Sequence, residues 1–296
     1  MKKLWLSVLL IALLSLTISP SAVLAKSDGP GQVNATDVQI VKKVTLHGPA
    51  AKGGKTVPTA ATGILGDQLS NNAKKYAIVI GINDYPGTGS DLQYTVADAR
   101  EMTNVTLNTY KFDNVIELTN TNATRTAIYE AINTIKGVAE SGDEVVFFFS
   151  GHGAKGKADD GDKNNVDQSI VVWDNGTFGF IWDGELVQWF SGFQTSRIIF
   201  VFDSCLSGGM AVLKAPGRVV CMASTINSMS LEGAAWGGGH GQFTYYFAEE
   251  GMEMKKADVR PKDNQVTVEE AFDYANANCK SQTPTIADGF DKDLLP

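Results

Sequence analysis

The sequence has few cysteines, few histidines and a shortage of basic residues. Only 3 of its 296 residues are Cys and 3 are His, which excludes a fold built on disulfide bonds. Its 25 Lys and Arg against 33 Asp and Glu give a net charge of −8, and a pI near 5.0 argues against a nucleic-acid-binding surface. The glycine motifs of nucleotide-binding loops do not follow the first expected strand. What remains, with 43% hydrophobic residues, is an acidic globular protein with enough apolar residues for a packed core.

Long hydrophobic runs are also scarce, apart from one at the N-terminus. Leu4 to Leu16 follows two lysines and precedes the small-residue pattern Val23-Leu24-Ala25, which is typical of a secretory signal peptide over residues 1–25. The run is short for a membrane span, with a retained anchor as the alternative. We therefore expect an exported protein, periplasmic, extracellular or at the cell surface, without a stable membrane span after signal cleavage. Residues 26–74 lack a period of 2 or 3.6 and predict a flexible leader or pro-segment.

From residue 75 onward, short apolar runs alternate with segments of helical periodicity, which predicts one α/β domain over residues 75–296. Its sheet is expected to be mostly parallel and flanked by helices, with the site at the carboxyl ends of the strands. Strands are predicted at 76–82, 115–118, 144–149, 169–173, 198–202 and 218–222, and helices at 91–109, 124–140, 182–190, 242–251 and 266–280.

A histidine and a cysteine follow two of these strands. Ser150-Gly151-His152-Gly153 comes after the strand 144–149, and Asp203-Ser204-Cys205-Leu206-Ser207-Gly208-Gly209 comes after the strand 198–202. The carboxyl ends of neighbouring parallel strands lie together, so His152 and Cys205 are expected to meet. An imidazole beside a thiol can generate the thiolate needed for nucleophilic catalysis. The alternative is a turn histidine and an inert buried cysteine.

From Tyr76 to about Gly289, with YAIVIGINDY, SGHG, DSCLSGG, GQFTYYFAEEG and QTPTIADGF, the chain resembles a caspase-like cysteine peptidase of the metacaspase type. The resemblance implies a caspase-like three-layer sandwich, with Cys205 as nucleophile and His152 as acid and base. It also implies that the backbone N–H groups of Gly153 and Cys205 hold the oxyanion.

The same resemblance implies a primary specificity pocket lined by Asp98, Ser150 and Asp203. Carboxylates in such a pocket would bind Arg or Lys and repel Asp. Asp98 stands in Thr95-Val96-Ala97-Asp98, where the family usually has Cys-x-Asn-Asp, so a solvated position on a helix is its alternative. A pocket selecting Asn is a further alternative.

Calcium is the one cofactor that the resemblance suggests. The peptidase chemistry itself requires no cofactor. Asp167 and Asp183 match calcium ligands of the family, whereas Gly184 and Val212 stand where it has further acids. The acidic loop 158–167 does not fit an EF-hand, because Asn165 replaces the required Gly and Val171 replaces the final Glu. Calcium dependence is left open against a solvated acidic loop.

The remaining cysteines and histidines have simpler interpretations. Cys221 and Cys279 could pair in an exported protein, with two buried thiols as the default. His47 lies in the leader, and His240 is interpreted as a solvated residue of a Gly-rich loop.

Together these features predict an exported, monomeric cysteine endopeptidase that cleaves peptides or proteins after Arg or Lys. Self-processing is expected at the leader lysines Lys43, Lys52, Lys55 and Lys74 or in the stretch Lys155–Lys163. The alternative is a catalytically silent caspase fold acting as a binding module at the cell surface.

Overall fold

The centre of the molecule is a six-stranded sheet with the order β13-β10-β9-β5-β3-β4. The computed structural model describes residues 30–48, 59–161 and 166–296, so the expected signal peptide lies outside the described residues. Five strands are parallel, and only β13 runs antiparallel to its neighbour β10. The strands are β3 (Lys75–Gly81), β4 (Asn114–Thr119), β5 (Glu144–Ser150), β9 (Ile198–Asp203), β10 (Arg218–Met222) and β13 (Thr285–Asp288). The predicted mostly parallel α/β sheet is confirmed.

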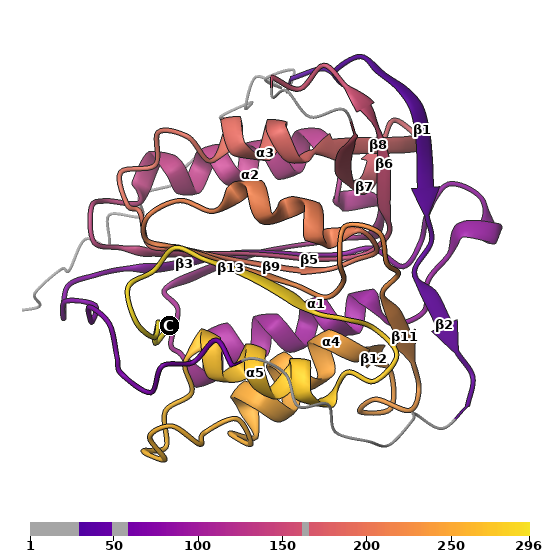
Figure 1. Cartoon of the computed structure of the whole chain (residues 1–296). Helices are drawn as coiled ribbons and strands as arrows, with labels where there is room; N and C mark the ends of the chain where they lie inside the picture. Colours follow the sequence, from indigo (N-terminus) through magenta and orange to yellow (C-terminus); the bar gives the residue numbers. More distant parts are fainter. Residues whose placement is uncertain (1–29, 49–58, 162–165) are drawn as a thin grey trace, which may run out of the picture.

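Helices cover both faces of this sheet and form three layers with it (Figure 1). The middle strands are unbroken apolar runs because both of their faces are buried. In β5, for example, Phe147 and Phe149 belong to the core on the side of α2 (Arg125–Val138) and α3 (Asp183–Trp189). Val146 and Phe148 belong to the core on the side of α1 (Thr95–Asn104) and α5 (Val268–Asn278). The three layers of the predicted sandwich are confirmed.

The helices begin and end close to the predicted bounds. The α-helices are α1 (Thr95–Asn104), α2 (Arg125–Val138), α3 (Asp183–Trp189), α4 (Gln242–Thr244) and α5 (Val268–Asn278). Two of them continue as π-helical turns, η2 (Val105–Thr109) after α1 and η5 (Tyr245–Glu253) after α4. Thr124 begins α2 by accepting a hydrogen bond from the Ala127 N–H, and Thr267 forms a capping box with Glu270 at the start of α5.

A second sheet of four antiparallel strands lies beside the α2 and α3 layer, with the order β1-β6-β7-β8. Its strands are β1 (Ala35–Val41), β6 (Gly153–Ala158), β7 (Asp167–Asp174) and β8 (Thr177–Trp182). The run 169–173 was expected among the parallel strands of the main sheet, and that expectation is wrong. An apolar run shows that a strand is buried but carries no information about its partner.

The leader contains regular structure where we expected a flexible segment. β1 pairs with β6, and β2 (Val44–Leu46) pairs with β11 (Leu231–Gly233) in a small sheet that also holds β12 (His240–Gly241). The expectation of flexibility is wrong for residues 35–46, because distant parts of the chain supply hydrogen-bond partners that the local sequence does not reveal. Removal of the leader as a pro-segment stays a prediction.

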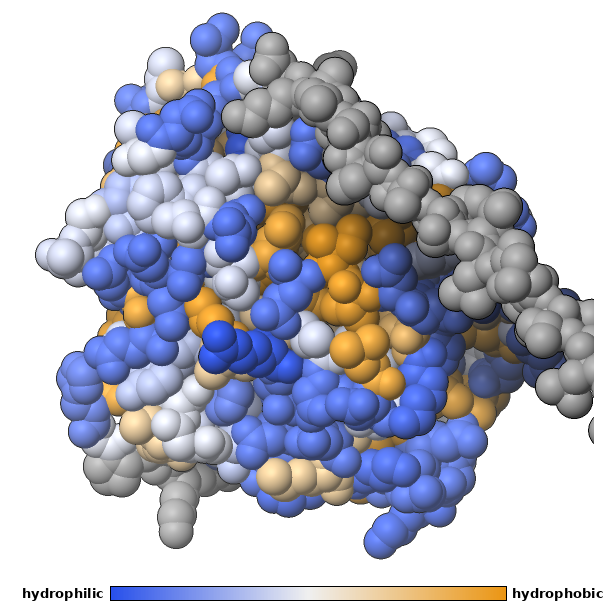
Figure 2. All heavy atoms as spheres, turned by 180° about the vertical axis from the view of Figure 1, so that it is seen from behind, coloured by the Kyte–Doolittle hydropathy of each residue, from blue (hydrophilic) through white to orange (hydrophobic). Residues whose placement is uncertain are grey.

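The face opposite the view of Figure 1 is mainly hydrophilic, and its largest group of hydrophobic residues lies near the centre of the view (Figure 2). Within the described ranges, no helix combines the length and the hydrophobicity that crossing a membrane requires.

Candidate active site

Strand register brings His152 and Cys205 to the same edge of the central sheet. β5 and β9 are parallel neighbours in which Ser150 lies opposite Asp203, and each of these residues stands two positions before one member of the pair. The turns after the two strands are in close contact, since a Cβ atom added to Gly153 would lie 1.9 Å from the Cys205 carbonyl oxygen. Only glycine fits at this position. The close approach also brings Gly153 and Cys205, the two expected oxyanion donors, side by side.

Three contacts orient the His152 imidazole. Its Nε2 lies 2.7 Å from the Ser90 carbonyl oxygen, its ring stacks on Tyr85 with centroids 4.6 Å apart, and its backbone N–H donates to the Tyr85 hydroxyl. A carbonyl can only accept, so Nε2 carries the proton and Nδ1 offers a lone pair. Burial lowers the pKa of His152 to about 4, which keeps the ring neutral and suited to act as a base.

The Cys205 thiol lies in a closed environment, with only 1% of the residue exposed. Its Sγ accepts a hydrogen bond of 3.2 Å from the Ser230 backbone N–H. Burial raises the pKa of Cys205 to about 11, so the sulfur is a thiol at neutral pH. Leu206 follows with φ of 61°, a left-handed conformation that costs a residue with a β-carbon about 1–2 kcal/mol and turns the chain sharply after Cys205.

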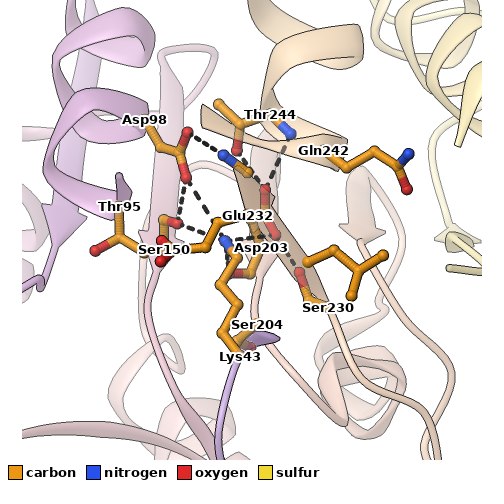
Figure 3. Close-up of polar contacts among 12 residues, drawn as sticks. Lys43, Thr95, Asp98, Ser150, Asp203, Ser204, Ser230, Glu232, Gln242 and Thr244 are labelled. Carbon is orange, nitrogen blue, oxygen red and sulfur yellow. Dashed lines mark hydrogen bonds and ion pairs between the residues drawn. The ribbon is translucent and has the colours of Figure 1, made fainter. Parts of the chain in front are cut away.

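The three residues expected to form the specificity pocket surround one buried cation (Figure 3). The Nζ of Lys43 lies 2.8 Å from Asp203 Oδ1, 3.6 Å from Asp98 Oδ2 and 3.1 Å from Ser150 Oγ. The side chains of Lys43, Asp98 and Asp203 have no solvent exposure. Asp98 is therefore not on a solvated helix face.

Both carboxylates are held in place by further hydrogen bonds. Asp203 Oδ1 accepts from the Ser230 hydroxyl, and Asp203 Oδ2 accepts from the backbone and hydroxyl of Thr244. Ser150 Oγ donates to Asp98 Oδ2 at 2.6 Å. Burial alone would raise the pKa of Asp98, but Lys43, His240 and Ser150 outweigh it and hold the pKa below the ordinary value.

His240 is part of this pocket, and its interpretation as a solvated loop residue is wrong. Its Nδ1 lies 3.1 Å from Asp98 Oδ1, its Nε2 lies 3.5 Å from Glu249, and only 12% of its side chain is exposed. Burial lowers the pKa of His240, but Asp98 and Glu249 outweigh it and raise the pKa. The glycines around His240 suggested a solvated loop, but in the structure its ring lies against Asp98 of α1.

Sequence reasoning missed several residues that complete the pocket: Lys43, Ser230, Glu232, His240 and Thr244. Only the pair of expected carboxylates could have pointed to Lys43, as two buried negative charges require a cation. Glu232 accepts hydrogen bonds from the backbone N–H groups of Gln93 and Tyr94. It thereby ties β11 to the segment before α1.

Three buried carboxylates form a separate group at the start of β7. Asp160, Asp167 and Asp183 each offer an oxygen within 4.8 Å of the others. The two expected ligands, Asp167 and Asp183, thus lie together, and Asp160 joins them from the acidic loop. A Cβ atom on Gly184 would lie 2.6 Å from the Asp160 carboxyl group, so Asp160 fills the space that a side chain at position 184 would need. Val212, at the other position lacking an acid, is 41% exposed.

All three cysteines are free and buried. Cys221 and Cys279 are therefore two thiols, as in the default interpretation, and no disulfide joins them.

Comparison with known proteins agrees with this geometry. The family described as "Metacaspase, peptidase C14 domain" matches residues 75–214. Metacaspase-4 of Arabidopsis thaliana is 33% identical over 146 residues, which cover 46% of this chain and 34% of that protein. Metacaspase-1 of Mycosarcoma maydis is 31% identical over 160 residues, which cover 49% of this chain and 40% of that protein. The chain thus spans little more than a third of the length of these relatives.

Solved structures share the fold at low sequence identity. A protein from Geobacter sulfurreducens superimposes with a TM-score of 0.57 and 18% identity, covering 74% of this chain and 95% of that one. The Drosophila initiator caspase Dronc gives a TM-score of 0.52 and 13% identity, covering 87% of this chain and 97% of that one. Residues 75–214, which carry the SGHG and DSCLSGG motifs, are thus similar to the metacaspase peptidase C14 domain, and the fold of the described residues is similar to that of a caspase.

Proposed function

We propose that the protein is an exported cysteine endopeptidase that cleaves peptide bonds after Lys or Arg. The observation that carries the specificity is the Lys43 ammonium, buried between Asp98 and Asp203 beside the turn that holds Cys205. An ammonium leaves water only where anions replace its hydration. The pocket thus has the charge, depth and hydrogen-bond acceptors to hold a basic side chain of a substrate.

The reaction begins when His152 Nδ1 takes the proton of the Cys205 thiol. The thiolate attacks the carbonyl carbon that follows the basic residue, and the backbone N–H groups of Gly153 and Cys205 stabilise the oxyanion. His152 then gives its proton to the departing amine, leaving an acyl group on Cys205. Water attacks this thioester with His152 as base and releases the carboxylic acid product.

The acid and amide alternatives fit the pocket less well. An Asp side chain would bring a third negative charge to two buried carboxylates, and a neutral Asn would leave both without a counter-charge. A catalytically silent binding module would have no use for an imidazole whose tautomer is fixed by Ser90.

Activity and specificity can be tested together on fluorogenic peptides that differ only in Arg, Lys, Asp or Asn before the scissile bond. We expect turnover of the Arg and Lys peptides, none by Cys205→Ala, and a loss of at least about a hundredfold in kcat/KM for Asp203→Asn, since charge-assisted hydrogen bonds of buried groups contribute several kcal/mol. Preference for Asp or Asn, or equal turnover by Cys205→Ala, would contradict the proposal.

Calcium is proposed to bind at Asp160, Asp167 and Asp183. Three carboxylates with oxygens within 4.8 Å of one another suit a hard cation. The site would stabilise the start of β7, whose partner β6 follows His152 directly. Calcium should raise the Tm of the wild type and of the exposed-residue control Asp159→Asn, but not that of Asp167→Asn. An equal rise in all three proteins would refute the site.

Export is proposed from residues 1–25 alone. N-terminal mapping of protein recovered outside the cytoplasm should place the first residue at Lys26 or further along the chain. Recovery of an intact Met1 in that fraction would favour the retained anchor.

A further inference from the structure

Residues 35–46 cross the catalytic edge of the molecule and touch both halves of the site. β1 adds an antiparallel strand to β6, directly after His152, and β2 adds a parallel strand to β11, directly after Ser230. Figure 1 shows this indigo segment running down one end of the sandwich, past the end of the central sheet. Lys43 lies between the two strands, where its side chain enters the pocket (Figure 3).

We propose that residues 35–46 are a built-in inhibitor that occupies the active site in the direction opposite to that of a cleavable substrate. The proposal rests on the proposed function for the identity of the pocket. It adds that Lys43 is an anchor and not a cleavage site.

The anchor has the contacts of a basic substrate side chain. Lys43 Nζ meets Asp203, Asp98 and Ser150, and it also donates to the Asp203 carbonyl oxygen at 3.1 Å. Burial alone would lower the pKa of Lys43, but Asp203, Asp98 and Glu232 more than offset it. Lys43 is therefore charged and fully paired in the pocket.

The backbone direction separates this segment from a substrate. In a productive complex, the residue in the pocket presents its own carbonyl to Cys205, and the nitrogen of the following residue meets His152 to receive the proton. Here the nitrogen at His152 Nδ1, 3.0 Å away, belongs to Lys43 itself. The following residue has turned away, since the Val44 N–H donates to the Ser230 carbonyl oxygen at 3.1 Å. The Lys43–Val44 bond is thus not presented for protonation.

The preceding peptide bond, between Lys42 and Lys43, is not placed for cleavage either. If the Lys42–Lys43 bond were cleaved, Lys42 would have to fill the pocket. Its Nζ instead donates to the Gly89 carbonyl oxygen in an exposed contact. Neither bond combines a basic residue in the pocket with the correct nitrogen at His152.

The segment also covers the edge on which a substrate would pair. Thr45 Oγ1 donates to the buried Glu232 at 2.6 Å, and β2 lies parallel to β11 over three residue pairs. A chain with its pocket residue in productive orientation would have to run along this edge in the other direction. Substrate and leader therefore exclude each other.

Inhibition follows from the occupied groups. The lone pair of His152 is taken by the Lys43 N–H, and Cys205 is almost completely covered. A cut after Lys52 or Lys55, which lie outside the described residues, would leave every contact of residues 35–46 intact. Activation thus requires dissociation of the leader after any cut.

The test compares the full chain with three variants, Lys43→Ala, Val44→Pro and the exposed neighbour Lys42→Ala. The readout is the rate at which iodoacetamide alkylates Cys205, localised by mass spectrometry, which does not depend on substrate preference. Lys43→Ala and Val44→Pro should be labelled at least about tenfold faster than wild type, since each 1.4 kcal/mol of lost leader binding is a factor of ten. Lys42→Ala should match wild type. Val44→Pro keeps Lys43 but removes the N–H that binds the Ser230 carbonyl oxygen. It therefore tests inhibition by the leader even if Lys43→Ala does not fold.

Peptide mapping of the wild type tests the direction. We expect Lys43–Val44 to remain uncut while other Lys bonds are processed. Unchanged labelling of both variants, or cleavage after Lys43, would overturn the proposal. Fast labelling of the variants without hydrolysis of any Arg or Lys peptide would instead refute the proposed function and leave the inhibitor in place.

Discussion

The ion pair between Lys43 and Asp203 gives the sharpest energetic prediction. Replacing Asp203 by Asn leaves a buried ammonium with one carboxylate 3.6 Å away, at Asp98. Removing one partner of a buried pair costs about 3–5 kcal/mol because the other charge stays desolvated. At about 2–4 °C of Tm per kcal/mol for a chain of this size, Asp203→Asn should lower the Tm by roughly 6–20 °C.

A double-mutant cycle isolates the pair from other effects of the substitution. Wild type, Asp203→Asn, Lys43→Met and the double variant would be unfolded thermally and in urea, all in a Cys205→Ala background so that self-cleavage cannot occur. Lys43→Met alone should also destabilise the protein, because it removes the cation that lies between the buried carboxylates of Asp98 and Asp203. The double variant should lose less stability than the sum of the single variants, by at least about 2 kcal/mol. Additivity within about 0.5 kcal/mol would refute the buried pair and the leader position that depends on it.

Three further predictions follow from space and charge at other positions. Gly153→Ala should abolish turnover while the protein still folds, because the added methyl would lie 1.9 Å from the Cys205 carbonyl oxygen; peptide assays and circular dichroism check this. Gly241→Ala should raise KM for Lys peptides far more than it lowers kcat, since its methyl would lie 2.2 Å from Asp203 Oδ2 in the pocket. A KM of the variant similar to that of the wild type would contradict this geometry. Burial raises the pKa of Glu269 to about 8, so its contribution to stability is present below pH 4.5 and is lost as the pH rises through 8. Glu269→Gln should therefore stabilise the protein more at pH 8.5 than at pH 5, by roughly 2–4 kcal/mol, and urea unfolding at both pH values measures the difference.

The sequence was informative where burial leaves a local pattern. β5 and β9 are apolar throughout because both faces of the central sheet are covered, so their positions could be predicted closely. Their polar ends then located His152, Cys205 and two of the three expected pocket residues on one edge. The partners of β7 could not be predicted, because periodicity records the burial of a strand and not its neighbours.

The leader could not be predicted because its structure depends on contacts with distant residues. A lysine in a polar segment is ordinarily solvated, and nothing near Lys43 in the sequence distinguishes it from Lys42. The difference arises only where Asp98 and Asp203, 55 and 160 positions further along the chain, meet at the pocket. His240 was misinterpreted for the same reason, since its partner Asp98 lies on α1.

The proposed specificity and the proposed inhibition use the same pocket, which links the two properties. A tethered segment competes with substrates at an effective concentration in the millimolar range. This concentration matches or exceeds that of a substrate present at a typical KM. The tether therefore favours the leader over free substrates while the chain between residues 46 and 59 is uncut. A cut there removes the tether and makes the inhibitor dilutable, although its contacts are unchanged. Under the proposed function, Asp98 and Asp203 hold the substrate as they hold Lys43, so a substitution that weakens the proposed selection of basic residues should also weaken the proposed inhibition.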